Sequence, residues 1–333
     1  MKREFPKFIC TAGQRIMSKD ILKKLYNAGM SHVRFNMSYR LECYSEMAKN
    51  IKELNEEDSC SIGLICDLAG SELRVNIEDN VEVKEGQQIV IGQDIFLNCG
   101  DLSCVKQNEE IIIKDGKIIL IAIKYENDKL YCVSKSNGII SPNSNCYNKS
   151  MYEKLPFLPL NDEINLIDAI RYECDYIAVS HVRTKENLKE INDFLEKNNA
   201  KIKLISKIEN KQAMENLDEI IDYSDGIMIA RGDLGKILPI EELAYNQKVI
   251  TKKTLAKGKY LMSATDYLFS LAETTALTRA EVVDLFTAYE DGILNILFTK
   301  EVALAKDPVY VLDVANKIYD SYLKYKGEED LYD

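Results

Sequence analysis

The sequence lacks the features that would direct a protein to a membrane or to the cell exterior. No hydrophobic run is long enough to span a bilayer, and the segment from Met1 to Lys7 contains no apolar signal-peptide core. The 9 cysteines include no C-x-x-C pair and are odd in number, which argues against a zinc site and against a complete disulfide framework. These absences predict a cytoplasmic protein.

The chain also lacks an excess of positive charge. The chain has 43 Lys and Arg against 54 Asp and Glu, a net charge of −11, so bulk electrostatics argue against a nucleic-acid or anionic-membrane partner. A local basic pocket for phosphate is still compatible with this balance. The 46% apolar and 29% charged residues are ordinary for a globular protein. A length of 333 residues allows one large barrel with a smaller module, or two domains.

Apolar, strand-like segments alternate with amphipathic helical segments at both ends of the chain. Six of the expected strands are residues 8–10, 32–38, 62–68, 176–180, 260–265 and 292–298. The other two are the apolar runs that begin at Lys203 and Gly226. Helical patterns include 18–25, 41–54, 185–197, 240–256, 277–289 and 308–325. About eight such units predict an α/β fold, a closed (β/α)₈ TIM barrel. An open doubly wound sheet is the alternative, but no G-x-G-x-x-G follows the first strand.

The pattern changes between the third and fourth expected strands. From about residue 75 to 154 no long helical pattern occurs, and short apolar runs at 88–91, 111–113 and 130–133 are separated by turn signals such as Asn137-Gly138. We therefore expect a small all-β domain inserted after the third strand. The predicted division is 1–74 and 155–333 for the barrel and 75–154 for the insert.

Charged residues follow the fifth and sixth expected strands. Lys207 and Glu209 are two positions apart and point to the same face of a strand, and Asp233 follows the next strand. Because the carboxyl ends of parallel strands meet at one rim, these groups should converge there. Two carboxylates and an ammonium group suit a divalent cation with a phosphate or enolate substrate. A purely structural Lys–Glu pair is the alternative interpretation.

Six segments resemble, in the same order, motifs of the pyruvate kinase family. They are residues 7–13 (K-I-V-C-T-I-G in the family), 34–38 (R-x-N-F-S), 67–74 (D-T-K-G-P-E-I-R), 205–210 (I-S-K-I-E-N), 224–235 (S-D-G-I-M-V-A-R-G-D-L-G) and 278–281 (T-R-A-E). The resemblance covers most of the chain and implies that the β insert is the family's lid domain. It also implies that the family's C-terminal regulatory domain is absent.

The resemblance implies cation sites. Glu209 and Asp233 would hold a divalent cation, Mg²⁺ or Mn²⁺, and Lys207 would lie against the transferring phosphoryl group and the enolate oxygen. A monovalent cation, K⁺, would be bound by four residues that belong to two of the motifs: Asn36, Ser38, Asp67 and Leu68, the last through its carbonyl.

The resemblance also implies substrate contacts. The substrate carboxylate would be bound by Thr265 and by the backbone of Ala230, Arg231 and Gly232. His181 would lie beside it. Thr299 keeps a hydroxyl group at the eighth strand, where the family has serine. The nucleotide side would include Arg34, which also contacts phosphate, together with Asn36, Tyr44 and Arg74.

Departures from the family motifs cluster on the nucleotide side. Tyr39-Arg40 stands where the family has His-Gly, and Leu304 stands where a nucleotide-contacting lysine is usual. Arg40 or Lys300 could replace the lost positive charge. His181 replaces a phenylalanine, and it is either an acid or base at a carboxylate site or a spectator.

The leading hypothesis is a metal-dependent, pyruvate-kinase-like phosphotransferase. It would transfer a phosphoryl group from phosphoenolpyruvate to a nucleoside diphosphate, giving pyruvate and a nucleoside triphosphate, with the β insert as a lid that excludes water. One alternative is a metal-dependent lyase, aldolase or decarboxylase that stabilises a pyruvate enolate, with His181 or Tyr39 moving protons. Another is a catalytically inactive binding protein. The expected partners are small molecules. A homo-oligomer formed through contacts between barrels is compatible with the sequence.

Overall fold

The structure of the protein is a computed structural model that describes residues 5–39, 41–57, 60–98, 101–114 and 116–329. The chain divides into two compact units. One contains the described residues up to Ala69 and from Leu160 onward, and the other runs from Gly70 to Pro159. The sequence placed these boundaries at 74 and 154.

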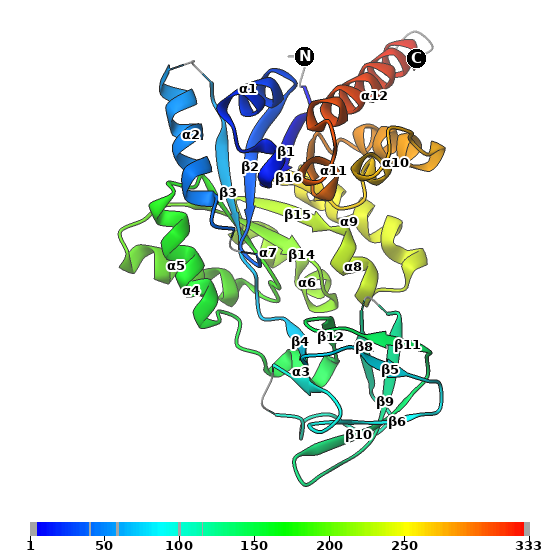
Figure 1. Ribbon diagram of the computed structural model, residues 1–333. Helices are drawn as coiled ribbons and strands as arrows, with labels where there is room; N and C mark the ends of the chain where they lie inside the picture. Colours follow the sequence, from blue (N-terminus) through cyan, green and yellow to red (C-terminus); the bar gives the residue numbers. More distant parts are fainter. Residues whose placement is uncertain (1–4, 40, 58–59, 99–100, 115, 330–333) are drawn as a thin grey trace. The chain divides into compact units, whose positions relative to one another are not determined.

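The first unit is a closed barrel of parallel strands, which confirms the predicted fold class (Figure 1). The strand order around the barrel is β1-β17-β16-β15-β14-β13-β3-β2. The strands are β1 (Lys7–Thr11), β2 (Met30–Asn36), β3 (Gly63–Asp67), β13 (Tyr176–Val179), β14 (Lys203–Ile208), β15 (Gly226–Ala230), β16 (Tyr260–Ala264) and β17 (Asn295–Phe298). Strands β3 and β13 pair directly although the whole β insert separates them in the sequence.

Helices cover the outside of the barrel (Figure 1). They are α1 (Lys19–Asn27), α2 (Tyr44–Glu57), α4 (Leu160–Arg171), α5 (Lys185–Lys197), α6 (Lys211–Glu215), α7 (Leu217–Tyr223), α8 (Arg231–Ile237), α9 (Leu243–Ala256), α10 (Arg279–Glu290), α11 (Lys300–Ala303) and α12 (Pro308–Glu329). Short 3₁₀ turns occur at Gln14–Ile16, Ile240–Glu242 and Phe269–Ala272. Helix α12 begins at its proline, as predicted, and packs against α1 and α10. None of the helices in the described ranges has the length and apolar character needed to cross a membrane.

Several predicted strands end earlier or begin later in the structure. The strand predicted at 292–298 begins at Asn295, because Gly292 has a φ of +88° and its N–H bonds to Tyr289 at the end of α10. The strand predicted at 32–38 ends at Asn36, whose side-chain oxygen accepts a bond from the Ser38 N–H and turns the chain. The predicted helix at 240–256 is a 3₁₀ turn followed by α9.

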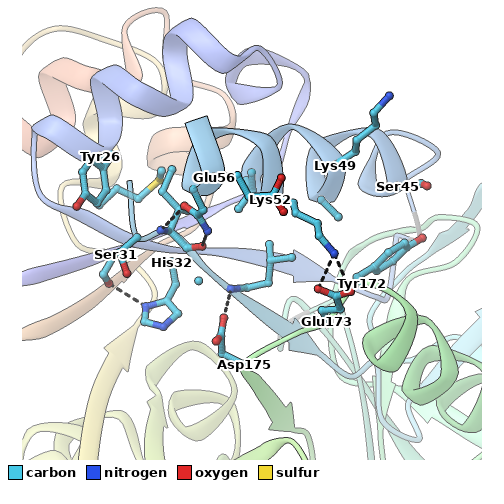
Figure 2. A pocket seen from close by; sticks show the side chains of 18 of the residues that line it. Tyr26, Ser31, His32, Ser45, Lys49, Lys52, Glu56, Tyr172, Glu173 and Asp175 are labelled. Atoms are coloured by element: carbon cyan, nitrogen blue, oxygen red, sulfur yellow. Dashed lines mark hydrogen bonds and ion pairs between the residues drawn. The ribbon is translucent and has the colours of Figure 1, made fainter. Parts of the chain in front are cut away.

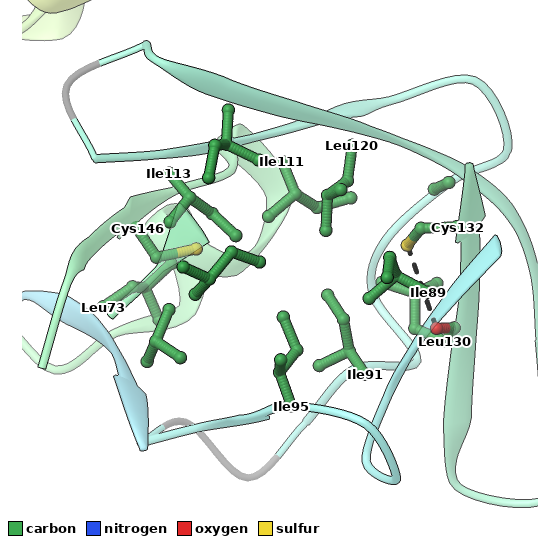
Figure 3. Close-up of a cluster of buried hydrophobic side chains, with 14 of the residues drawn as sticks. Leu73, Ile89, Ile91, Ile95, Ile111, Ile113, Leu120, Leu130, Cys132 and Cys146 are labelled. Carbon is green, nitrogen blue, oxygen red and sulfur yellow. Dashed lines mark hydrogen bonds between the residues drawn. The ribbon is translucent and has the colours of Figure 1, made fainter. Parts of the chain in front are cut away.

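The second unit is built almost entirely from antiparallel strands. A seven-stranded sheet has the order β6-β10-β9-β8-β12-β4-β7, and β11 and β5 form a separate pair. The elements are β4 (Leu73–Asn76), β5 (Val81–Val83), β6 (Gln88–Ile91), β7 (Phe96–Leu97), β8 (Glu110–Ile113), β9 (Ile118–Glu126), β10 (Lys129–Ser134), β11 (Gly138–Ile140), β12 (Asn145–Tyr147) and α3 (Lys149–Lys154). Alternate residues of these strands point inward and form one apolar core, which includes Ile89, Ile111, Leu120 and Leu130 (Figure 3).

Candidate active site

The polar rim of the barrel follows from the alternation of side chains along its strands. Seven of the strands supply an apolar layer inside the barrel, which includes Ile9, Ile65, Ala178 and Ile205. Residues two positions further along a strand point to the same face. In these four strands that next interior position is polar, since it is occupied by Thr11, Asp67, Ser180 and Lys207. Polar side chains therefore line the interior of the barrel at the carboxyl ends of these strands.

Lys207 lies at the centre of this polar layer. Its Nζ is 2.6 Å from Ser180 Oγ, 3.1 Å from Asp67 Oδ1 and 3.2 Å from Glu209 Oε1. The Ser180 hydroxyl donates to the Leu68 carbonyl at 2.7 Å, so it accepts its bond from Lys207. The ammonium group is held by two carboxylates and one hydroxyl.

These charges interact strongly because they are buried. Asp67 and Glu209 are each 1% exposed and Lys207 is 9% exposed. Burial alone would lower the pKa of Lys207, but the carboxylates of Asp67, Glu209 and Asp233 outweigh burial and raise it. Burial acts to raise the pKa of Asp67, yet Arg34, whose Nε donates to Oδ2 at 2.6 Å, and Lys207 lower it. Lys207 and Asp67 are therefore both charged at neutral pH.

Glu209 and Asp233 reach the region of Lys207 from neighbouring elements. Glu209 directly follows β14, and its Oε2 accepts a bond from the His181 N–H at 3.0 Å. Asp233 lies in the first turn of α8, after β15, and pairs with Lys236 at 3.0 Å. Partial burial opposes ionisation of Asp233, but Lys236 and Lys207 lower its pKa. Glu209 thus contacts the Lys207 ammonium directly, whereas the ion pair of Asp233 is with Lys236. The convergence of the two acids on one cation stays a prediction.

The donor chemistry of Glu209 and Asp233 fits a hard divalent cation. Each carboxylate oxygen can accept from a protein donor and still bind an ion, because it has more than one lone pair. Within the described residues, no three or more His, Cys, Asp and Glu side chains form a group that could hold a metal ion. A cation held by Glu209 and Asp233 would therefore complete its coordination with substrate oxygens and water.

The four residues predicted to bind a monovalent cation lie at the ends of β2 and β3. Asn36 and Asp67 are direct neighbours across the two strands. Ser38 is exposed, and its N–H bonds to the Asn36 side-chain oxygen at 3.2 Å. The Leu68 carbonyl accepts from Ser180. This segment offers amide, carboxylate and carbonyl oxygens within two adjacent strand ends, which is suitable chemistry for a monovalent cation.

Thr265 is held in an unusual loop after β16. Its φ is +82°, a region that β-branched residues rarely adopt. The Arg231 guanidinium donates to the Thr265 carbonyl from Nε at 3.0 Å and from Nη2 at 2.7 Å, pairs with Asp284 at 2.9 Å and lies 3.7 Å from the centre of the Tyr267 ring. A Cβ on Gly232 would lie 3.0 Å from the Thr265 methyl group. The side chain of Arg231 thus positions the loop, and the predicted strand at 260–265 ends one residue earlier because of this backbone turn.

Thr299 lies directly after β17 and contacts a buried acid. Its N–H and hydroxyl donate to Glu301 Oε2 at 2.6 Å and 2.9 Å. Glu301 is fully buried, and burial raises its pKa. Thr299 therefore has a structural partner at the rim.

Two predicted nucleotide contacts have other surroundings in the structure. The Tyr44 ring is 2% exposed, stacks on Phe35 with the ring centres 4.4 Å apart, and donates to the Asn36 carbonyl at 2.9 Å. A buried ring of this kind has no face open to an adenine base. Arg74 belongs to the β insert, where it bonds to Glu72 and to the Asn143 carbonyl. Arg40 lies outside the described residues.

Sequence reasoning missed two members of the rim. Ser180 bonds directly to Lys207, and Thr11 accepts from Arg34 Nη1 at 3.2 Å. Both lie at the carboxyl ends of predicted strands, on the same face as an apolar core residue two positions earlier. That alternation was the available signal.

A separate cavity of about 850 Å³ lies at the opposite ends of the strands (Figure 2). It is lined by residues that begin strands, such as Lys7, Met30 and Gly63, and by side chains of α2. His32 contacts Ser31 Oγ through Nδ1 at 2.9 Å here, and Asp175 accepts from the Leu64 N–H at 2.8 Å. The two histidines of the chain thus lie at opposite ends of barrel strands.

A closed parallel barrel whose carboxyl rim carries buried acids around a lysine has the architecture of a (β/α)₈-barrel enzyme. Residues 3–312 match the family described as pyruvate kinase, barrel domain. The chain belongs to the pyruvate kinase family.

Individual relatives agree with this assignment. The chain is 34% identical to a pyruvate kinase of Methanocaldococcus jannaschii over 94% of its own length and 68% of the relative, and 32% identical to one of Dictyostelium discoideum over 94% and 65%. A crystal structure of a pyruvate kinase from Cryptosporidium parvum superposes with a TM-score of 0.88 at 28% identity, covering 94% of this chain and 68% of that one. The chain thus spans about two thirds of the length of these relatives.

Proposed function

We propose that the protein transfers a phosphoryl group from phosphoenolpyruvate to a nucleoside diphosphate, giving pyruvate and a nucleoside triphosphate. One observation carries this proposal: the charged Lys207 ammonium is buried at the barrel rim in contact with the carboxylates of Asp67 and Glu209. A fixed positive charge of this kind can stabilise the negative charge that develops on a transferring phosphoryl group or an enolate oxygen. The lyase and binding-protein alternatives receive no support from the family match.

Each rim residue has a proposed role. Glu209 and Asp233 hold Mg²⁺ or Mn²⁺, and the bound ion supplies charge neutralisation at the phosphate and enolate oxygens. Lys207 contacts the same oxygens. Asp67 and Ser180 fix the position of the ammonium group, so that little reorganisation is needed during the reaction.

The carboxylate of the acid substrate is proposed to bind at the end of β15. Ala230 is the last residue of that strand, and Gly232 approaches Thr265 so closely that a side chain would displace it. Arg231 holds the Thr265 backbone from the other side. Thr265 is proposed to bond to the substrate, and Thr299 to assist from the neighbouring strand.

The nucleotide side is less like the family pattern. Arg34 is the proposed phosphate contact, with K⁺ at Asn36, Ser38, Asp67 and the Leu68 carbonyl neutralising further charge. The buried Tyr44 ring cannot stack on a base in this conformation. We therefore propose weak discrimination among nucleoside diphosphates. A cytoplasmic location and contacts between barrels remain predictions.

The test is pyruvate formation from phosphoenolpyruvate and ADP with Mg²⁺ and K⁺, for the natural protein and for Lys207→Met. Removal of one charge-stabilising donor lowers turnover by about 10²–10³-fold in comparable sites. Lys203→Met is the matched control, because Lys203 is an exposed residue at the other end of the same strand. It should leave turnover within about twofold of the natural protein, since exposed charges contribute little. Equal pyruvate formation by the natural protein and Lys207→Met would count against the proposal.

A further inference from the structure

Two lysines contact the two acids that are proposed to bind the divalent cation. Lys207 Nζ lies 3.2 Å from Glu209 Oε1, and Lys236 Nζ lies 3.0 Å from Asp233 Oδ1. Each carboxylate therefore already has an ammonium group as its counter-ion. A cation that binds to these oxygens has to compete with that positive charge.

The two ion pairs differ in how firmly they are held. The Lys207 side chain is 11% exposed, and its ammonium also contacts Ser180 Oγ at 2.6 Å and Asp67 Oδ1 at 3.1 Å. The Lys236 and Asp233 side chains are 38% and 43% exposed. Exposed ion pairs are weak, because water screens the charges and both side chains lose rotamer freedom when they pair. Lys236 can therefore leave its acid at little cost, whereas Lys207 is fixed by three partners.

The helix that carries Asp233 keeps Lys236 close to it. Both residues belong to α8, the seven-residue helix that directly follows β15. They are three positions apart, so they lie on the same side of the helix. Because the backbone sets this spacing, the ammonium group remains near Asp233 even when the two side chains are not in contact. Lys236 is thus always available to pair with this carboxylate again.

We propose that Lys236 is a resident counter-ion of Asp233 that lowers the affinity of the site for Mg²⁺ or Mn²⁺, because its ammonium must leave the carboxylate before the cation can bind there. This inference rests on the proposed function, in which Asp233 is one of the two acids that hold the cation. A dication stabilises a carboxylate more strongly than one ammonium group does, so the exchange can proceed. Lys236 therefore raises the concentration of metal ion at which the site fills.

The test is Mn²⁺ binding to the natural protein and to Lys236→Met, measured from the electron paramagnetic resonance signal of the free ion. Methionine keeps an unbranched side chain, removes the ammonium group and favours a helix about as well as lysine does. Lys236→Gln is the second uncharged variant if Lys236→Met does not fold. Lys236→Arg keeps a positive charge that can pair with Asp233.

Lys211→Met is the matched control for repulsion through space. Lys211 is exposed and begins α6, two residues after Glu209, so its charge lies near one acid of the site while Lys236 contacts the other. If Lys236 acted only through general repulsion of a cation, the substitutions Lys236→Met and Lys211→Met should have similar effects.

We expect Lys236→Met to bind Mn²⁺ about threefold to fivefold more tightly than the natural protein, which is the upper range for the loss of one exposed ion pair. Lys236→Arg and Lys211→Met should bind Mn²⁺ within about twofold of the natural protein. A smaller change in the uncharged variants, or equal tightening in Lys236→Arg or Lys211→Met, would overturn the inference.

Asp233→Asn separates this inference from the proposed function. If Asp233→Asn weakens Mn²⁺ binding while Lys236→Met leaves it unchanged, only the role of Lys236 fails. If the natural protein binds no Mn²⁺, or if Asp233→Asn binds it as tightly as the natural protein does, the cation site itself fails and both proposals fall.

Discussion

Replacement of Asp67 by asparagine should destabilise the protein severely. Asp67 is 1% exposed, and its two oxygens contact Arg34 Nε at 2.6 Å and Lys207 Nζ at 3.1 Å. Asp67→Asn keeps the shape of the side chain but leaves two buried cations without this carboxylate. Removal of one partner from a buried ion pair costs about 3–5 kcal/mol. That is a large share of the roughly 5–15 kcal/mol by which domains are stable.

The effect should also depend on pH. Arg34 and Lys207 lower the pKa of Asp67 despite its burial. A carboxyl group whose pKa is lower in the folded state contributes stability above its unfolded pKa, about 3.9, and this contribution is lost as the pH falls through the folded value. The difference between the natural protein and Asp67→Asn should therefore be constant from about pH 5 to 8 and shrink below about pH 4.

Urea unfolding, followed by the near-ultraviolet circular dichroism of the 19 tyrosines, measures this difference. Asp20→Asn is the matched control, because Asp20 forms an exposed pair with Lys24 on α1. An exposed pair of this type contributes only about 0.3–0.5 kcal/mol. If Asp67→Asn lost no more stability than Asp20→Asn, the reasoning that assigns Asp67 a central electrostatic role would be refuted.

Three further changes should have distinct effects. A Cβ on Gly63 would lie 2.4 Å from the His32 ring, so Gly63→Ala should lower the free energy of unfolding by about 1–3 kcal/mol in thermal unfolding. Gly327 in α12 has open space around it, so Gly327→Ala should be neutral or stabilising. Equal effects of the two substitutions would show that the space around Gly63 does not limit the side chain there. Burial lowers the pKa of His32. The nearby charge of Asp175 opposes this effect, and the charge of Lys7 adds to it. The stability associated with neutral His32 should be present above about pH 6.5 and be lost as the pH falls toward the folded pKa, and His32→Gln should flatten this part of the pH–stability curve. Arg231→Lys should release the Thr265 loop and lower kcat by about 10²-fold, with Mn²⁺ affinity unchanged; an unchanged kcat would exclude a positioning role for Arg231.

The barrel could be predicted from the sequence because its strands and helices have clear and different periods. Helix α5 was predicted with the bounds found in the structure, Lys185–Lys197, where a threonine cap precedes an amphipathic pattern. Element ends were less certain where tertiary contacts decide them. Asn36 ends β2 through its own side chain, and Thr265 leaves the strand conformation because Arg231 holds its carbonyl.

The approach of Lys207 and Glu209 could also be predicted, since strand geometry places both on one face. The partners of Lys207 were harder to predict. Ser180 and Asp67 come from strands far away in the sequence, and only closure of the barrel brings them to the same ammonium group. The burial of Tyr44 could not be read from a motif, because it depends on stacking against Phe35 in three dimensions.

The most direct test of the central claim is the anomalous scattering of Mn²⁺ in crystals of the protein grown with Mn²⁺ and oxalate, an analogue of the pyruvate enolate. We expect one anomalous peak about 2.0–2.4 Å from carboxylate oxygens of both Glu209 and Asp233, with the Lys207 ammonium facing the oxalate. A peak elsewhere on the barrel, or carboxylates that do not share one ion, would show that Glu209 and Asp233 do not form a cation site.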